Sequence, residues 1–218
     1  GIKKFFQNHI STNINIAILP NENCPNAMRN YGISKDIKES IEDAFNSELL
    51  SRVDLLECNG FIAFNRIVIG DMHGMNRLDY NQNSRLDKIK IFFTNLKNIT
   101  FNSYTLSTSP EQSIQTAASG ITILEHSTIM NKESAIKDDL SIHDGKLNAY
   151  ILAPTSLLSY IWYLLSIFFY QRISLIELPK SLGFIKSSKL TVSSKEMLDF
   201  KIDHKDIHQS STIELEVL

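Results

Sequence analysis

The chain has 218 residues, of which 43% are hydrophobic, and this suits a globular chain with a sizeable core. A formal net charge of -2 and scattered basic residues exclude the basic stripe that nucleic-acid binding requires, so no nucleic-acid partner is expected. Cys24 and Cys58 lie in neither a Cys-x-x-Cys pair nor a zinc-binding spacing. We expect both to be reduced thiols of a cytoplasmic protein.

The first fifty residues predict one strand and two helices. Residues 14–19 carry apolar residues between asparagines and stop at a proline, which is typical of a strand end. Asn26 is placed to cap a short helix. Ser34 is placed to cap a second helix over 35–50, whose apolar face is formed by Ile37, Ile41, Ala44, Phe45 and Leu49.

The middle of the chain changes to strands. Asn59-Gly60 is the strongest short-range hairpin signal and predicts two strands around it, the second over 61–69. Asp71 and His73 then lie in a loop that would either line a cleft or be simply solvated. Further on we expect a helix over 86–96, strands over 100–106 and 114–124, and a turn at Pro110-Glu111 between them.

An apolar segment over 157–170 follows a predicted strand at 147–152. It is too short to span a bilayer, and it predicts a helix that is apolar nearly all round. Such a helix is buried in a core, buried in a homodimer or dipped into a membrane surface, and we favour the first two. The last expected strands cover 190–192, 197–202 and 212–217. Runs of strands with few helices predict an α+β protein, mainly an antiparallel two-layer β-sandwich.

Six short segments occur in an order that is informative beyond any one of them: Ile18-Leu19-Pro20, Pro25-Asn26-Ala27-Met28, Val53-Asp54-Leu55, Phe64-Asn65…Ile69-Gly70, Asp144-Gly145-Lys146-Leu147 and Ile202-Asp203-His204-Lys205. This order resembles that of the lipid kinases related to diacylglycerol and sphingosine kinases. The resemblance implies that residues 1–50 end an α/β nucleotide lobe and that residues 51–218 form the C-terminal β-sandwich. It also implies an enzyme that uses ATP and Mg²⁺ to phosphorylate a lipid hydroxyl, on diacylglycerol or a sphingoid-like lipid.

The resemblance also implies roles for individual residues. Asp203 is the candidate catalytic carboxylate, accepting the proton of the lipid hydroxyl, although a turn carboxylate that caps its own backbone is the competing interpretation. Asn26 is a candidate nucleotide contact, which a helix cap explains equally. A cation near the Asp-Gly turn would suit Asp138, Asp139 or Asp144, since hard cations take oxygen ligands. The simpler interpretation of Asp144-Gly145 is a type I′ turn.

Three departures from the family pattern bear on activity. The 218 residues contain no Gly-Gly-Asp-Gly-Thr loop, so we expect the chain to begin after that loop and to be inactive alone. Glu22-Asn23-Cys24-Pro25 stands where the family has glycines that let a phosphate approach the backbone. His204 and Lys205 stand where the family has Gly and Glu.

These departures keep other functions open. The main alternative is a degenerate family member that binds a lipid or a protein partner without catalysis. A relative of the NAD kinases, which share the architecture, is a weaker one. Contact of Lys186, Lys189 and Lys195 with acidic headgroups would make the cytoplasmic protein peripheral to the membrane, although scattered surface lysines need no such explanation.

Overall fold

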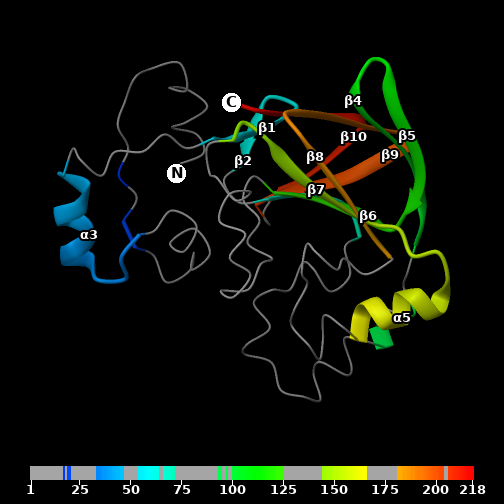
Figure 1. Cartoon of the computed structure of the whole chain (residues 1–218), viewed down its shortest axis with the longest axis horizontal. Coiled ribbons are helices and arrows are strands. Elements are labelled where there is room, and N and C mark those ends of the chain that lie inside the picture. Colours follow the sequence, from blue (N-terminus) through cyan, green and yellow to red (C-terminus); the bar gives the residue numbers. More distant parts are fainter. Residues whose placement is uncertain are drawn as a thin grey trace.

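The computed structural model describes residues 17, 19–20, 33–46, 54–63, 66–71, 93–94, 97, 100–124, 144–165, 181–203 and 206–218. Within these ranges the chain forms ten strands and two helices. Most of the strands pair antiparallel in one curled sheet, which confirms the predicted α+β, sandwich-like class (Figure 1). The short helix predicted at Asn26 and most of the helix at 86–96 lie outside the described residues, as does most of the strand at 14–19, whose described residues 17 and 19 are not in a strand.

The helices are α3 (Ile37–Ala44) and α5 (Leu157–Leu165). The first strands are β1 (Leu56–Cys58), β2 (Phe61–Ala63), β3 (Arg66–Gly70), β4 (Asn102–Ser109) and β5 (Gln112–Ala118). The remaining strands are β6 (Gly120–Leu124), β7 (Leu147–Leu152), β8 (Leu182–Ser187), β9 (Lys189–Ile202) and β10 (Asp206–Val217).

The long strand β9 joins the parts of the sheet. The main path runs β2-β1-β10-β9-β3-β6-β7-β8. On one side β9 pairs with β10, and on the other it pairs first with β4 at residues 191–193 and then with β3 at residues 200–202. The two segments predicted at 190–192 and 197–202 are therefore one strand of 14 residues. Strand β8 was not predicted.

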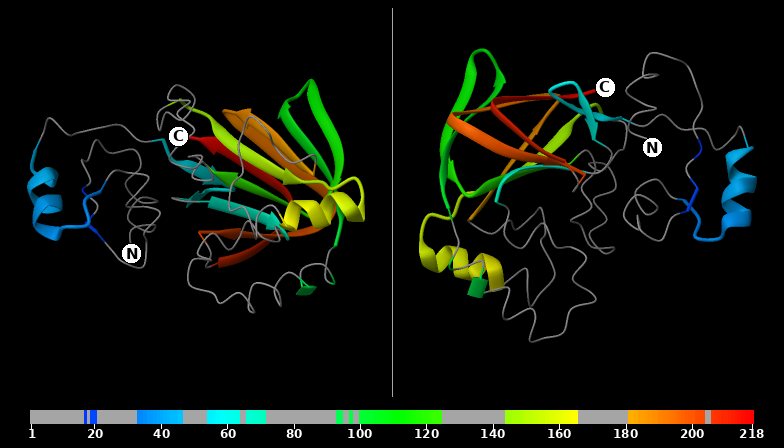
Figure 2. Two further views of the ribbon diagram at one scale, coloured as in Figure 1. Left: turned by 60° about the horizontal axis from the view of Figure 1, so that its bottom comes forward. Right: turned by 180° about the vertical axis from the view of Figure 1, so that it is seen from behind.

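The core lies inside the curl of this sheet. In Figures 1 and 2, β7 and β8 lie across from β9 and β10, so that two layers face one another. The buried cluster takes side chains from both layers. It includes Ile67 and Ile69 of β3, Ile121 and Ile123 of β6, Val192 and Phe200 of β9, and Ile213 of β10. All six residues of β7 are buried, Asn148 among them, as expected for the mostly apolar strand predicted at 147–152.

The Asn59-Gly60 turn is confirmed. Both residues have a positive φ, +48° and +81°, as a type I′ turn requires. The Asn59 side chain also accepts a hydrogen bond from the Glu214 N–H at 2.7 Å and donates to the Thr212 carbonyl at 3.2 Å. The segment predicted as one strand over 61–69 is two strands with different partners, because β2 pairs with β1 whereas β3 pairs with β6 and β9.

The segment predicted as one strand over 114–124 is also divided. β5 pairs with β4, and the chain then turns at Ser119 so that β6 pairs with β3 and β7. Gly120 is needed at this crossing, because a Cβ there would lie 2.7 Å from the backbone of Asp71. The turn predicted between the two segments at residues 110–111 is confirmed, since Ser109 pairs directly with Gln112.

The helix predicted over 35–50 is capped two residues later than expected and ends at Ala44, with Phe45 as its C-cap. Its N-cap is Asp36, whose carboxylate accepts from the N–H groups of Lys38 at 2.8 Å and Glu39 at 3.3 Å. The apolar stripe is present but not buried, since Phe45 is 87% exposed. In Figures 1 and 2, α3 lies at one end of the molecule, away from the sheet.

Candidate functional site

Asp203 lies where the chain turns from β9 into β10, with a φ of +48°. Its carboxylate Oδ1 accepts a hydrogen bond from the Arg66 N–H at 3.1 Å, and its own N–H donates to the Arg66 carbonyl at 2.9 Å. The strand register agrees with these two hydrogen bonds, because Ile67 of β3 pairs with Ile202 of β9. The half-buried carboxylate therefore caps the backbone of a neighbouring strand.

Arg66, the partner of Asp203, is a functional candidate that sequence reasoning missed. Its side chain is 6% exposed, and it is the one charged residue in the otherwise apolar strand β3. A buried charge is expensive unless it has partners, so an Arg at the start of an apolar strand is itself a signal. The contact between Arg66 and Asp203 could not be predicted from neighbouring residues, because Asp203 is 137 residues away in sequence.

The Asp144-Gly145 turn leads into β7, as predicted, but it is not a type I′ turn. Only Gly145 of the pair has a positive φ, +62°, whereas type I′ requires two. Asp144 Oδ1 accepts from the Lys146 N–H at 2.9 Å, and its Oδ2 lies 2.9 Å from Lys186 Nζ. The Gly145 N–H donates to Asp54 Oδ2 at 2.6 Å, which ties this turn to the start of β1.

Of the candidate metal and nucleotide residues, only Asp144 is among the described residues. Asn26, Asp138 and Asp139 lie outside the described residues. Within the part of the chain that the structure describes, no three His, Cys, Asp or Glu side chains gather in a way that would hold a metal ion. Asp144 is engaged by an ammonium and a backbone N–H, so its role as a cation ligand stays a prediction.

Asp71, the loop carboxylate, lies at the other end of β3. Its N–H donates to the Ser119 carbonyl at 2.8 Å. Burial chiefly raises the pKa of Tyr104 and of Tyr160, and the negative charge of Asp71 raises both pKa values further. These two tyrosines are buried, and Tyr160 belongs to α5, so both stay protonated near the end of β3. His73 lies outside the described residues.

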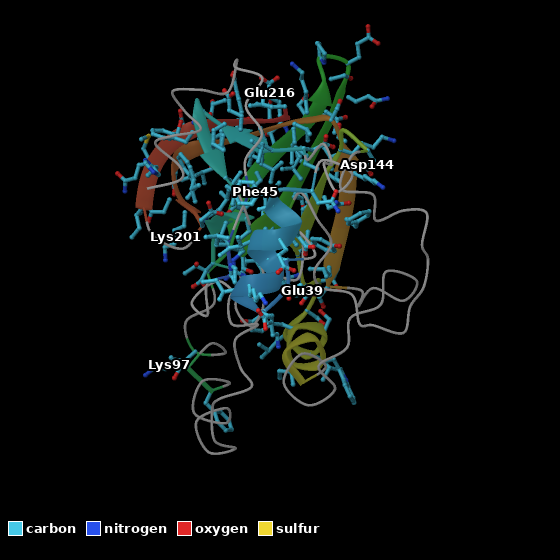
Figure 3. The ribbon with its side chains drawn as sticks, turned by 90° about the vertical axis from the view of Figure 1, so that its left-hand side faces the viewer. Glu39, Phe45, Lys97, Asp144, Lys201 and Glu216 are labelled. Atoms are coloured by element: carbon cyan, nitrogen blue, oxygen red, sulfur yellow. The ribbon has the colours of Figure 1, made fainter. Side chains whose placement is uncertain are left out.

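The predicted carboxylates do not come together. Asp71 and Asp203 are separated by the length of β3, about 16 Å for the five steps from Arg66 to Asp71. Asp144 is nearer the Asp203 end by register, since Arg66 pairs with Leu124 and Leu124 with Asn148, but β6 lies between. Figure 3 shows Asp144 and Lys201, two residues before Asp203, on opposite sides of the sheet. The best-supported site is thus the Asp203 turn alone.

Helix α5 buries Tyr160 and exposes other apolar side chains among its described residues. Tyr160 is 1% exposed, whereas Leu157, Leu158 and Trp162 are 62%, 65% and 63% exposed. Helix α5 lies at one end of the sheet in Figures 1 and 2. No helix among the described residues is both long and apolar enough to cross a bilayer.

The predicted headgroup lysines are dispersed. Lys186 pairs with Asp144, and Lys189 pairs with Glu216 at 2.6 Å. The Glu216 carboxylate raises the pKa of Lys189 through that hydrogen bond. Lys195 is exposed on β9. Two of the three therefore already have a carboxylate partner, which weakens their claim to an acidic headgroup.

A curled antiparallel sheet with one helix at its end, and a carboxylate held at the turn of its last hairpin, define an α+β protein with a β-sandwich-like fold. The solved structures agree. A diacylglycerol kinase from Bacillus anthracis str. Sterne matches with a TM-score of 0.66 at 14% identity, covering 100% of this chain and 69% of that one.

Two further structures from the same organism, provisionally named as diacylglycerol kinases, have TM-scores of 0.68 and 0.66 at 15% and 14% identity. They too cover the whole of this chain, and 70% and 71% of their own. No family model and no curated protein matches the sequence. At this identity the likeness is one of fold, and it confirms the resemblance to the diacylglycerol kinases at that level.

Proposed function

We propose that this chain is the C-terminal part of a diacylglycerol kinase-like lipid kinase. The full-length protein would transfer a phosphoryl group from ATP to the hydroxyl of diacylglycerol or a sphingoid-like lipid. The observation that carries the proposal is the match of the entire chain, at a TM-score of 0.66, to a diacylglycerol kinase. The six sequence segments that follow the family order support it independently.

Asp203 is the residue we assign to the reaction. A lipid hydroxyl becomes a better nucleophile as its proton passes to a carboxylate within hydrogen-bond reach. The two backbone contacts to Arg66 fix the turn that carries Asp203. An ionised carboxylate has about four lone-pair sites, so accepting one backbone N–H leaves it able to accept a proton as well.

ATP and Mg²⁺ belong to the proposal as cofactors of the full-length protein. No described group of side chains fits a Mg²⁺ ion, so no step of the reaction is assigned to metal ligands of this chain. What the described residues contribute is the placement of Asp203. The exposed side of α5 is the part we assign to the lipid surface, since exposed Leu and Trp side chains favour the membrane interface.

The test is lipid phosphorylation by the full-length protein with labelled ATP and diacylglycerol, comparing Asp203→Asn. Asparagine keeps the acceptor oxygen and tolerates a positive φ but cannot take the proton. We expect kcat to fall by about 100-fold or more, with an unchanged melting temperature. Asp199→Asn, an exposed carboxylate on the same hairpin, is the matched control and should retain full activity. Equal kcat values for Asp203→Asn and the wild type would remove Asp203 from the reaction.

A second candidate function is a family member that binds lipid or a protein partner without catalysis. The apolar, exposed side of α5 favours it, as does the replacement of the expected Gly and Glu after Asp203 by His204 and Lys205. The same assay separates the two candidates. Vesicle binding without any phosphorylation by the wild-type protein would support the second.

A further inference from the structure

Strands β3, β6, β7 and β8 lie side by side in the sheet (Figure 1) and have a second buried face, opposite the apolar core. Successive side chains of a strand point to opposite faces, so Arg66, Thr122 and Asn148 lie opposite the core residues Ile67 and Ile121. Arg66, Thr122 and Asn148 are 6%, 2% and 7% exposed. They are three of the six buried polar or charged residues among the described ones, and Arg66 alone carries a charge. Buried polar groups therefore concentrate on this face.

The strand register brings these three side chains together. Arg66 pairs with Leu124 across β3 and β6, and Leu124 pairs with Asn148 across β6 and β7. Thr122 lies two residues before Leu124, so it is the diagonal neighbour of both Arg66 and Asn148. Diagonal neighbours in an antiparallel sheet are about 7–8 Å apart, within reach of long side chains. Arg66, Thr122 and Asn148 thus form one buried group, which we call the polar cluster.

The hydroxyl of Thr122 is the observation that points to a ligand. Its Oγ1 is buried and has no hydrogen-bond partner among the residues that the structure describes. A buried hydroxyl without a partner is costly, and such a group in a native structure indicates a bound water, ion or ligand. Valine would fill the same volume without that cost. Threonine at this position therefore indicates an occupant that hydrogen-bonds to it.

The charges on this face favour an anion as the occupant. The register places Lys201 and Lys186 on the same face as Arg66. The carboxylates beside these cations are Asp203, bonded to the Arg66 backbone, and Asp144, 2.9 Å from Lys186 Nζ. Three cations against two carboxylates leave an excess of one positive charge. A guanidinium beside a hydroxyl and an amide is a donor set that suits the oxygens of a phosphate.

We propose that the polar cluster binds a phosphomonoester group. The Arg66 guanidinium holds two of its oxygens, and the Thr122 hydroxyl and the Asn148 amide donate to the others. The site adjoins Asp203, the carboxylate assigned to the lipid hydroxyl, because Asp203 binds the Arg66 backbone. A lipid phosphate is the product of the proposed function, so the choice of a lipid source rests on that function. The site itself rests on burial, register and charge.

The test is calorimetric titration of this chain with inorganic phosphate and with vesicles containing phosphatidic acid. Arg66→Met removes the charge at similar side-chain length and should weaken binding by about tenfold or more. Lys38→Met removes the same charge from an exposed position on α3 and should bind like the wild type. Tighter binding to phosphatidic acid than to phosphatidylglycerol vesicles would identify a lipid phosphate as the occupant. Binding of inorganic phosphate alone would identify free phosphate.

Thr122→Val keeps the test independent of the loss of a buried charge. Valine has the shape of threonine and leaves no hydroxyl to satisfy, so the melting temperature should not fall, whereas binding should weaken by about fivefold. Thr212→Val, at an exposed position of β10, is the matched control and should bind like the wild type.

Three results would overturn the inference: a wild-type chain that binds neither probe, a Thr122→Val variant that binds normally, or equal losses in Lys38→Met and Arg66→Met. Neither probe requires ATP, so this test and the kinase assay fail separately. Phosphate binding by the polar cluster, without lipid phosphorylation by the full-length protein, would retain the site and reject the kinase.

Discussion

Replacement of Asp203 by Asn, Gly and Ala separates the two structural demands of the β9–β10 turn. The first demand is an acceptor oxygen for the Arg66 N–H, which lies 3.1 Å from Asp203 Oδ1. The second is a backbone that accepts a φ of +48°. Asn meets both demands, Gly meets only the second, and Ala meets neither.

The expected losses follow from these contacts. Removing the acceptor leaves a backbone N–H of Arg66 without its carboxylate partner, which costs about 1 kcal/mol of unfolding free energy. Forcing alanine into the left-handed region costs about 1 kcal/mol more. We therefore expect Asp203→Asn to match the wild type, Asp203→Gly to lose about 1 kcal/mol and Asp203→Ala to lose about 2 kcal/mol.

Urea unfolding followed by far-ultraviolet circular dichroism measures these differences. With a slope of about 2 kcal/mol/M, the midpoint for Asp203→Ala should fall by about 1 M and that for Asp203→Gly by about half as much. The reasoning is refuted if Ala and Gly variants share one midpoint, since the positive φ would then carry no cost. It is also refuted if the Asn variant falls with the Ala variant, since the acceptor oxygen would then not be what matters.

Three more predictions test other parts of the structure. In Gly70→Ala, the new Cβ would lie 2.5 Å from the Tyr104 hydroxyl at a φ of +66°, so unfolding free energy should fall by about 2 kcal/mol or more, measured in urea. Gly145→Ala, at +62° in open space, should lose only about 1 kcal/mol, and equal losses would exclude the steric contact as the cause. Burial first, then Glu57, raises the pKa of Cys58 to about 12, so its thiol should resist Ellman's reagent until the protein unfolds. Between about pH 9 and pH 12 the thiol ionises in the unfolded chain before it ionises in the folded protein. The free energy of unfolding should therefore fall as the pH rises through this range, and Cys58→Ala should not show this fall. Trp162, the single tryptophan, should shift its emission to the blue on vesicles containing diacylglycerol, and an unchanged spectrum would contradict membrane contact of α5.

The sequence predicted those turns and strands whose conformation is set by adjacent residues. The Asn59-Gly60 turn needs a positive φ at two successive residues, and few residue pairs other than Asn-Gly supply that conformation at low cost. The segment at 147–152 is apolar at nearly every position, so only a strand buried on both faces suits it. In both cases the information lies within a few residues of the element.

The remainder of the fold and site depends on contacts between distant residues. Nothing near Arg66 shows that its backbone will hold Asp203, 137 residues later. The Asp144-Gly145 pair favours a type I′ turn locally, but Asp54, 91 residues earlier in the chain, binds the Gly145 N–H and a different turn results. Division of the long strands at Ser119 likewise follows from partner choice, which alternation of apolar residues does not encode.

The sharing of β9 among three partners has a consequence for how the chain folds. β3 and β4 are made early, yet each must wait for residues 191–202 before it can pair with β9. During synthesis the edges of β3 and β4 that pair with β9 therefore remain without that partner until nearly the whole chain has emerged. Such non-local closure slows folding and exposes unpaired strands to aggregation. The chain should depend on chaperones more than a helical protein of equal length.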